Sequence, residues 1–248
     1  MELSEYDALE RVEREHWFYK GKRQLVQHWI DRAVEFAPGD RITDCGAGTG
    51  ELVRELKGIF EYRGIGVVGI EFSEEARRLA RERKGTELIA GSILNLPIND
   101  GSTAVTIALD VLEHVEDDRL AFSEMLRVTR SGGLVIINVP AFMSLWSEWD
   151  VSLGHYRRYT KALLADVLAP YRHEFDLLHF DYANAFAFVP ILTLRTVQKV
   201  LRLKSRFEDR IPGPRVNKLL LDLFVGPSRA EWFHPPFGSS LFCVLKKR

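Results

Sequence analysis

A glycine-rich segment flanked by acidic residues is the part of the sequence best suited to bind a ligand. The strand-like residues 41–45 run into Gly46-Ala47-Gly48-Thr49-Gly50 and then into a helical pattern. Glycines at such a strand-to-helix turn let the backbone approach a bound molecule closely. Asp44 precedes the turn, and Glu71, 27 residues later, ends the next apolar segment. A carboxylate there can accept hydrogen bonds from both ribose hydroxyls, so we expect a nucleoside-containing ligand.

The residue after the turn separates two classes of nucleoside cofactor. A dinucleotide fingerprint has a third glycine where the pyrophosphate meets the helix N-terminus. This chain has Glu51 at that position, and its negative charge opposes a phosphate. A nucleotide-dependent oxidoreductase is therefore a minority hypothesis. S-adenosylmethionine (SAM) has no phosphate, and its cationic sulfonium and ammonium groups suit an acidic Asp44.

Five motifs within residues 40–140 resemble, in combination, the class I SAM-dependent methyltransferases of the type 11 or UbiE/UbiG-like group. They are Asp44 to Gly50, Glu71, Leu96-Pro97, Leu109-Asp110-Val111-Leu112-Glu113-His114-Val115, and Arg127-Val128-Thr129-Arg130-Ser131-Gly132-Gly133. The resemblance implies an α/β, Rossmann-like fold, in which a seven-stranded, mostly parallel sheet has an antiparallel last strand and a helical cap is added. It also implies SAM as cofactor and S-adenosyl-L-homocysteine (SAH) as product.

The same resemblance implies which residues contact the cofactor. They are Asp44, Gly46, Ala47, Gly48, Gly50, Glu71, Phe72, Ser92, Ile93, Asp110, Val111 and His114. Ser92 and Ile93 align with the family's segment near the adenine amino group. The pair Glu113-His114 is interpreted as a helix start that closes the floor under the cofactor, with a direct catalytic role as the alternative.

Two further segments, His16 to Arg23 and Leu145 to Tyr159, contain candidates for the acceptor side and resemble a subgroup of this family. The second segment follows the fifth strand, and ligands in open α/β sheets bind beyond the carboxyl ends of the strands. His155 has the intrinsic pKa of a general base and is the candidate for removing the acceptor proton. Further catalytic candidates are Tyr159 and Arg158. Candidate substrate contacts are Trp17, Phe18, Arg23, Trp146 and Arg157.

A structural interpretation of these residues stays open. In it, His155 and Tyr159 anchor the loop, the two arginines pair with helix carboxylates, and the aromatic residues pack in the core or in a lid. Paired arginines that faced a pocket would instead bind a carboxylate or phosphate of the acceptor.

The hydrophobic pattern predicts alternating strands and helices after the N-terminal region. Strands are expected at 41–45, 66–71, 87–90, 104–110 and 133–139, and helices at 51–60, 74–83 and 117–127. Such alternation predicts a parallel sheet with helices on both faces. A helix at 161–168 and strands at 174–180 and 240–246 should follow. The predicted division is an N-terminal helical cap (1–39), a SAM-binding core (40–183), a helical insertion or cap (184–238) and a final core strand (239–248).

The insertion contains an amphipathic helical pattern with a basic flank. Apolar side chains recur at helical spacing from Phe186 to Leu201, and the basic residues are Arg195, Lys199, Arg202, Lys204 and Arg206. Three roles are open for this helix: a lid, a homodimer surface, or a peripheral contact with anionic membrane. We expect the lid, which would make the acceptor pocket apolar.

Composition restricts the partners and the cellular setting. The 34 basic and 35 acidic residues nearly cancel, which argues against a nucleic-acid partner. Cys45 and Cys243 are expected to be buried, reduced thiols, and no metal site is predicted. Neither a secretory signal nor a membrane-spanning segment is recognised, so we expect a cytoplasmic protein.

The sequence therefore predicts a SAM-dependent methyltransferase that acts on a small or lipid-like metabolite, with oxygen favoured as the methylated atom. The alternative of a different class is a non-catalytic methyltransferase-fold partner subunit. Asp44, Gly46, Gly48 and Glu71 disfavour a version of that alternative with an empty pocket, because a subunit freed from binding could lose them.

Overall fold

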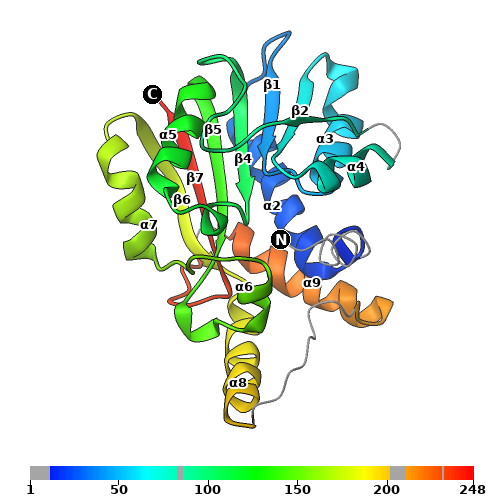
Figure 1. The fold of residues 1–248 in the computed structure, drawn as a ribbon, viewed down its shortest axis with the longest axis vertical. Helices are drawn as coiled ribbons and strands as arrows, with labels where there is room; N and C mark the ends of the chain where they lie inside the picture. Colours follow the sequence, from blue (N-terminus) through cyan, green and yellow to red (C-terminus); the bar gives the residue numbers. More distant parts are fainter. Residues whose placement is uncertain (1–11, 83–85, 202–210, 231) are drawn as a thin grey trace.

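The computed structural model describes residues 12–82, 86–201, 211–230 and 232–248 (Figure 1). In these segments seven strands form one sheet in the order β3-β2-β1-β4-β5-β7-β6. Their bounds are β1 Arg41–Cys45, β2 Gly66–Glu71, β3 Leu88–Ala90, β4 Thr103–Leu109, β5 Thr129–Pro140, β6 Phe175–Ala183 and β7 Ser240–Lys247. Pairings among β1 to β5 are parallel, whereas β7 is antiparallel to β5 and β6. The predicted sheet with its antiparallel last strand is confirmed.

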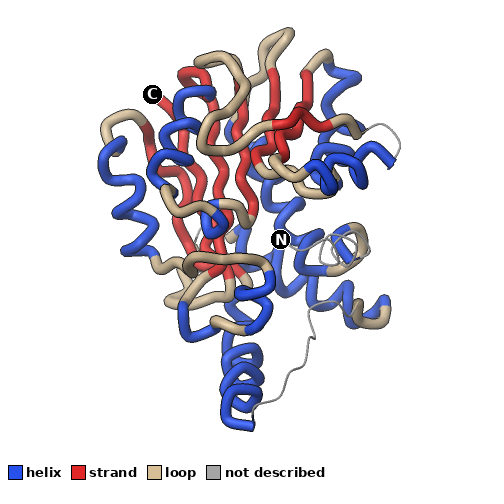
Figure 2. Tube along the Cα trace, viewed as in Figure 1, coloured by secondary structure: helices blue, strands red, loops and turns tan. Residues whose placement is uncertain are grey.

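Helices cover both faces of the sheet. Figure 2 shows the sheet as the central layer between them. One hydrophobic core joins the sheet to α2 (Trp17–Ala33), α3 (Glu51–Phe60) and α9 (Pro214–Arg229). The opposite core joins it to α5 (Asp118–Val128) and α7 (Lys161–Leu168). The remaining helices are α4 (Glu74–Glu82), α6 (Glu148–Ser152) and α8 (Ala185–Leu201), with single turns η1 (Glu61–Arg63), η2 (Leu112–His114), η3 (Met143–Leu145) and η4 (Ala169–Tyr171).

The apolar strands supply both cores because successive side chains of a strand point to opposite faces. Along β5, Leu134 and Ile136 belong to the core under α2, whereas Val135 and Ile137 belong to the core under α5. All four side chains are fully buried. This alternation fixes the register of the central strands, and so places their carboxyl ends at one edge of the sheet.

The Leu96-Pro97 and Arg127 motifs brace the connection that enters β4. The Arg127 guanidinium donates hydrogen bonds to the carbonyls of Leu96 (3.0 Å) and Ile98 (2.9 Å). Glu124 holds the guanidinium from α5 and accepts a hydrogen bond from the Leu96 N–H at 2.8 Å. These motif residues therefore position the scaffold.

Strand ends differ from the predicted ones where long-range pairing extends them. β5 begins at Thr129, four residues before the predicted start at 133, because Thr129 pairs with Thr103 ahead of an irregularity in the ladder. β6 reaches Ala183 because it pairs with β7 up to Ser240. Neither pairing is encoded in the local hydrophobic pattern.

The predicted insertion forms two helices with different surroundings. α9 packs on α2, where Phe224 is fully buried, while α8 projects away from the sheet (Figure 1). Several apolar side chains of α8 are exposed, among them Val189, Val197 and Val200. Within the described residues, no helix is long and apolar enough to span a membrane.

Some predicted features lie outside the described residues. These are the helical pattern of residues 1–11 and three members of the basic flank, Arg202, Lys204 and Arg206. The predicted division into cap, core, insertion and final strand stays a prediction.

The contact between α2 and α9 predicts the effect of a methyl group at Gly21. A Cβ there would lie 2.2 Å from the buried Phe224 ring, whereas a Cβ at Gly58 of α3 would meet nothing within 4 Å. We expect Gly21→Ala to lower the free energy of unfolding by about 1–3 kcal/mol through overpacking. Gly58→Ala, the matched control, should raise it by up to about 1 kcal/mol because alanine favours the helix. Urea unfolding measures both, and equal effects of the two variants would contradict the packing described here.

Candidate active site

A cavity of about 530 Å³ opens at the carboxyl ends of β1, β2 and β4, beneath α2 and α6. Every residue predicted to contact the cofactor lines the described cavity except Gly50. The structure therefore brings together side chains from four separate motifs, as the parallel topology requires.

Two glycines of the turn, Gly46 and Gly50, are needed for its packing. Gly46 has a left-handed φ of +75°, and a Cβ there would lie 2.6 Å from the Val111 side chain. Gly50, with φ +80°, precedes α3, and its Cβ would lie 2.5 Å from Thr86. A side chain at either position would therefore collide with neighbouring protein atoms.

Acidic side chains gather around this turn. Asp44 is 4% exposed, and burial, together with the charges of Glu13 and Glu71, raises its pKa to about 8. Burial also raises the pKa of Glu71, although hydrogen bonds from the Ser73 N–H (2.8 Å) and the Gly48 N–H (2.9 Å) oppose that shift. Such a site favours a cationic ligand, which would stabilise the ionised carboxylates.

Asp110 extends the cavity on the side of β4 in a strained conformation. Its φ of +55° is unusual for a residue with a Cβ. The Asn138 side chain donates a hydrogen bond to its Oδ1 at 2.5 Å, and the buried Lys22 forms an ion pair with Oδ2. Strain of this kind persists where surrounding contacts hold it, and it is concentrated at functional sites.

Lys22 lines the cavity one residue from the predicted Arg23, although no sequence motif singles it out. Its ammonium also lies over the rings of Phe18 and Tyr19, 4.3 Å and 4.8 Å from their centroids. Glu13 and Leu153 were missed as well. A lysine one helical turn after Phe18 and Tyr19 was the available signal for Lys22.

Three residues predicted to act on the acceptor instead hold the loop that follows β5. The Arg158 guanidinium contacts the Asp150 carboxylate through two hydrogen bonds (2.7 and 3.1 Å). Asp118 Oδ2 accepts hydrogen bonds from Arg157 and from the buried Tyr159 hydroxyl, both at 2.8 Å. None of the three lines the cavity formed by the described residues. The structural interpretation fits this geometry, and catalytic or substrate roles for these residues stay predictions.

His155 lies behind the cavity wall. Its Nδ1 is 2.9 Å from Asp150 Oδ1, and its ring meets the His114 ring edge-on with centroids 4.5 Å apart. His114 lines the cavity, but His155 does not in the part of the chain that the structure describes. A role for His155 as general base therefore requires a proton path through its neighbours, and it stays a prediction.

The groups around His155 have shifted pKa values. Burial lowers the pKa of His114 to about 4, and the charge of His155 adds to this effect. Burial raises the pKa of Glu113 well above its usual value, and the charge of Asp110 adds to that. Burial also raises the pKa of Asp150, but hydrogen bonds from His155 and Arg158 and the Arg158 charge outweigh it, so the net pKa lies below the usual value.

The remaining substrate candidates are divided between packing and the cavity. Trp17 and Phe18 contact Phe224 of α9, with ring centroids 6.1 and 5.9 Å away, so they join α2 to α9. Trp146 lies beside the His155 ring. Arg23 does line the cavity, where Glu55 and the Glu13 carbonyl hold its guanidinium at 2.9 and 2.7 Å.

Comparison with known proteins supports the sequence resemblance. The family model described as "Methyltransferase domain" matches residues 43–137. An uncharacterised methyltransferase of Mycobacterium sp. (strain KMS) is 33% identical over 134 residues, which cover 53% of this chain and 52% of that protein. The demethylmenaquinone methyltransferase of Thermobifida fusca is 34% identical over 139 residues, covering 53% and 55%. The chain thus spans about half the length of the curated relatives it matches.

A solved structure extends the likeness to almost the whole fold. Geranyl diphosphate methyltransferase in complex with SAM superposes with a TM-score of 0.58 at 16% identity, over 91% of this chain and 85% of that one. At this identity the likeness shows the fold alone. The family match, the sheet order and the glycine turn agree, and residues 43–137 are similar to the class I SAM-dependent methyltransferases.

Proposed function

We propose that this chain transfers a methyl group from SAM to a small-molecule acceptor, with SAM bound in the cavity at the glycine turn. The observation that carries the proposal is the buried pair of acids, Asp44 and Glu71, at the edge of that cavity. SAM offers a ribose to one carboxylate and cationic groups to the other. A related fold solved with SAM supports the choice of cofactor.

Each part of SAM has a chemically suitable neighbour. Glu71 already accepts two backbone hydrogen bonds, yet carboxylate oxygens have further lone pairs for the ribose hydroxyls. The Lys22 ammonium has donors beyond its bond to Asp110 for the amino-acid carboxylate of SAM. Phe72 is 81% exposed at the cavity, where its ring could stack on adenine.

In the reaction, the acceptor nucleophile forms a bond to the SAM methyl carbon as the carbon–sulfur bond breaks. The electron pair of that bond goes to sulfur, which gives the neutral thioether of SAH, and a base takes the acceptor's proton when the nucleophile is a hydroxyl. Oxygen as the acceptor atom is part of the proposal. A Thermobifida relative named demethylmenaquinone methyltransferase supports a lipid-like acceptor.

The apolar part of the cavity lies between β4 and α6. Leu109, Val115, Trp149 and Leu153 line it, whereas no described residue of α8 does. The proposal of an apolar acceptor is therefore supported by residues of α6 and of the loop after β4. The lid role expected of α8 gives it no support, because α8 does not line the cavity formed by the described residues. The exposed apolar side chains of α8 keep a dimer surface or a membrane contact as proposals for that helix.

The assignment of Glu71 to the ribose can be tested by removing its carboxylate. Glu71→Ala should weaken SAH binding by about 2–3 kcal/mol, or roughly 30- to 150-fold, through the loss of charge-assisted hydrogen bonds. Glu87→Ala, which removes an acid that is 74% exposed, is the control and should leave the affinity unchanged. Calorimetry measures both. Unchanged SAH affinity in a folded Glu71→Ala protein would contradict the assignment.

The raised pKa of Asp44 predicts that this residue destabilises the ligand-free protein at high pH. With a folded pKa near 8, above its ordinary 3.8, the protonated carboxyl contributes stability that is complete below about pH 4 and is lost as pH rises through 8. Asp44→Asn does not titrate, so its melting temperature should exceed that of the wild type near pH 9 by several degrees, and the difference should vanish near pH 4.

The same substitution should weaken SAM binding, since it removes the charge that faces the cation. Asp166→Asn, at an exposed position of α7, is the control and should not change the pH dependence. If the wild type melts no lower than Asp44→Asn near pH 9, the pKa of Asp44 is not raised as described here.

A turnover measurement distinguishes a catalytic methyltransferase from a non-catalytic partner subunit. Incubation with methyl-labelled SAM and a metabolite extract should give a product whose mass includes the label. Tight SAH binding with no labelled product from any extract would favour the non-catalytic alternative.

A further inference from the structure

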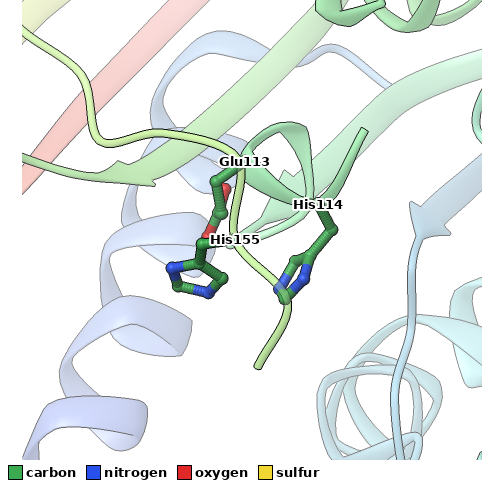
Figure 3. A group of neighbouring side chains, drawn as sticks. All are labelled: Glu113, His114 and His155. Atoms are coloured by element: carbon green, nitrogen blue, oxygen red, sulfur yellow. The ribbon is translucent and has the colours of Figure 1, made fainter. Parts of the chain in front are cut away.

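Three side chains with metal-binding atoms meet behind the cavity wall. Glu113 and His114 belong to η2, and His155 comes from the loop after α6; Figure 3 shows the three close together. One donor atom from each lies within 4.8 Å of the others. The backbone brings them together, because the Tyr156 N–H donates a 2.7 Å hydrogen bond to the Glu113 carbonyl.

The donor atoms of Glu113 and His155 are buried and unsatisfied, whereas His114 is half-buried and its ring has a backbone hydrogen bond with Leu153. Glu113 is fully buried, and the His155 side chain is 6% exposed. Within the described part of the chain, neither Glu113 carboxylate oxygen nor His155 Nε2 has a hydrogen-bond partner. Buried polar atoms without partners are costly, and they commonly indicate a function or a bound species.

The surroundings of His155 prepare it to act as a ligand. Asp150 Oδ1 lies 2.9 Å from Nδ1, and Asp150 is itself held by Arg158 and by the Ser147 N–H at 2.8 Å. An ionised Asp150 therefore accepts the Nδ1 hydrogen, which leaves the Nε2 lone pair directed away from Asp150. Carboxylates in this arrangement orient the histidine ligands of metal sites and increase their basicity.

We propose that Glu113, His114 and His155 bind a divalent transition-metal ion, of the class of Fe²⁺, Co²⁺ or Zn²⁺, at the wall of the cavity. Two imidazoles and one carboxylate suit these ions and leave coordination positions open. Bonds of about 2.0–2.2 Å require the side chains to approach one another by roughly 1 Å from their present positions.

The open positions would face the cavity, because His114 lines it. An oxygen of the acceptor could then coordinate the ion, which would lower the pKa of a bound hydroxyl before methyl transfer. That consequence rests on the proposed function, whereas metal binding itself does not. The site also departs from the sequence-based expectation that the chain has no metal site.

The competing explanation is a buried proton. A protonated Glu113 that donates to His155 Nε2 would satisfy that nitrogen and one of the two carboxylate oxygens with no metal. The two explanations differ in their response to added metal, so the experiment can separate them.

The test uses the full chain, stripped with a chelator and titrated near pH 7 with Co²⁺ while its visible absorption bands are recorded. Bound Zn²⁺ is counted separately by elemental analysis after dialysis. We expect one ion per chain and Co²⁺ bands that indicate nitrogen ligation. Asp150→Asn should weaken binding by about 10- to 100-fold, and Glu113→Gln and His155→Gln should weaken it further. His173→Ala, which removes a histidine side chain that is 79% exposed, is the matched control and should bind normally.

Binding of SAH to the stripped protein is measured alongside. Normal SAH binding with no bound Co²⁺ or Zn²⁺ would overturn the metal site, favour the shared proton, and leave the proposed function intact. Metal binding that Glu113→Gln and His155→Gln do not weaken would also overturn it. Metal binding without SAH binding would support the site and count against the proposed function. Circular dichroism verifies the fold of each variant. If His155→Gln does not fold, the metal affinity of the isosteric Glu113→Gln alone tests the site.

Discussion

The burial of negative charge at the carboxyl ends of β1 and β2 is the constraint on which the site depends. Asp44 and Glu71 are both buried beside one cavity, and the charge of Glu71 raises the cost of ionising Asp44. Glu71 reduces its own cost by accepting two backbone hydrogen bonds, and one of these ties it to Gly48 of the glycine turn. For Asp44, the free-energy cost of ionisation remains as long as no cation is bound nearby. The fold thus maintains a locally unfavourable arrangement that a positively charged ligand can relieve.

The far side of the cavity is held by paired charges. Asp150 binds Arg158 and His155, and Asp118 binds Arg157 and Tyr159, so the loop after β5 is fixed by two carboxylates. These are partly or fully buried ion pairs, in which the loss of one partner would leave the other charge uncompensated. The arrangement orients the His155 ring, places His114 at the cavity and brings α6 over it. The loop therefore determines the shape of the acceptor side.

The cofactor half of the site could be predicted from sequence because its residues follow strands that the hydrophobic pattern identifies. Asp44, Glu71 and Asp110 each mark the carboxyl end of a parallel strand or its first following residue, and parallel topology brings such ends together. Their joint position is therefore a consequence of local patterns.

The acceptor half was less predictable because long-range contacts decide it. Arg157, Arg158 and Tyr159 have residue types that suit catalysis as well as anchoring, and only the positions of Asp118 and Asp150 distinguish the two roles. Lys22 was missed because a helix pattern does not show which polar residue will face a cavity formed by other segments. The association of Glu113, His114 and His155 across 42 positions had no local signal either.

The central claim is that a bound cation stabilises the ionised form of the buried carboxylates. Counting the protons released when SAM binds tests it most directly. Calorimetric titrations at about pH 7, in buffers with different enthalpies of ionisation, give this number. Because the ligand-free Asp44 has a pKa of about 8, the account predicts that the wild type releases a fraction of a proton approaching one and that Asp44→Asn releases much less. SAM binding with equal proton release in the two proteins would contradict the account.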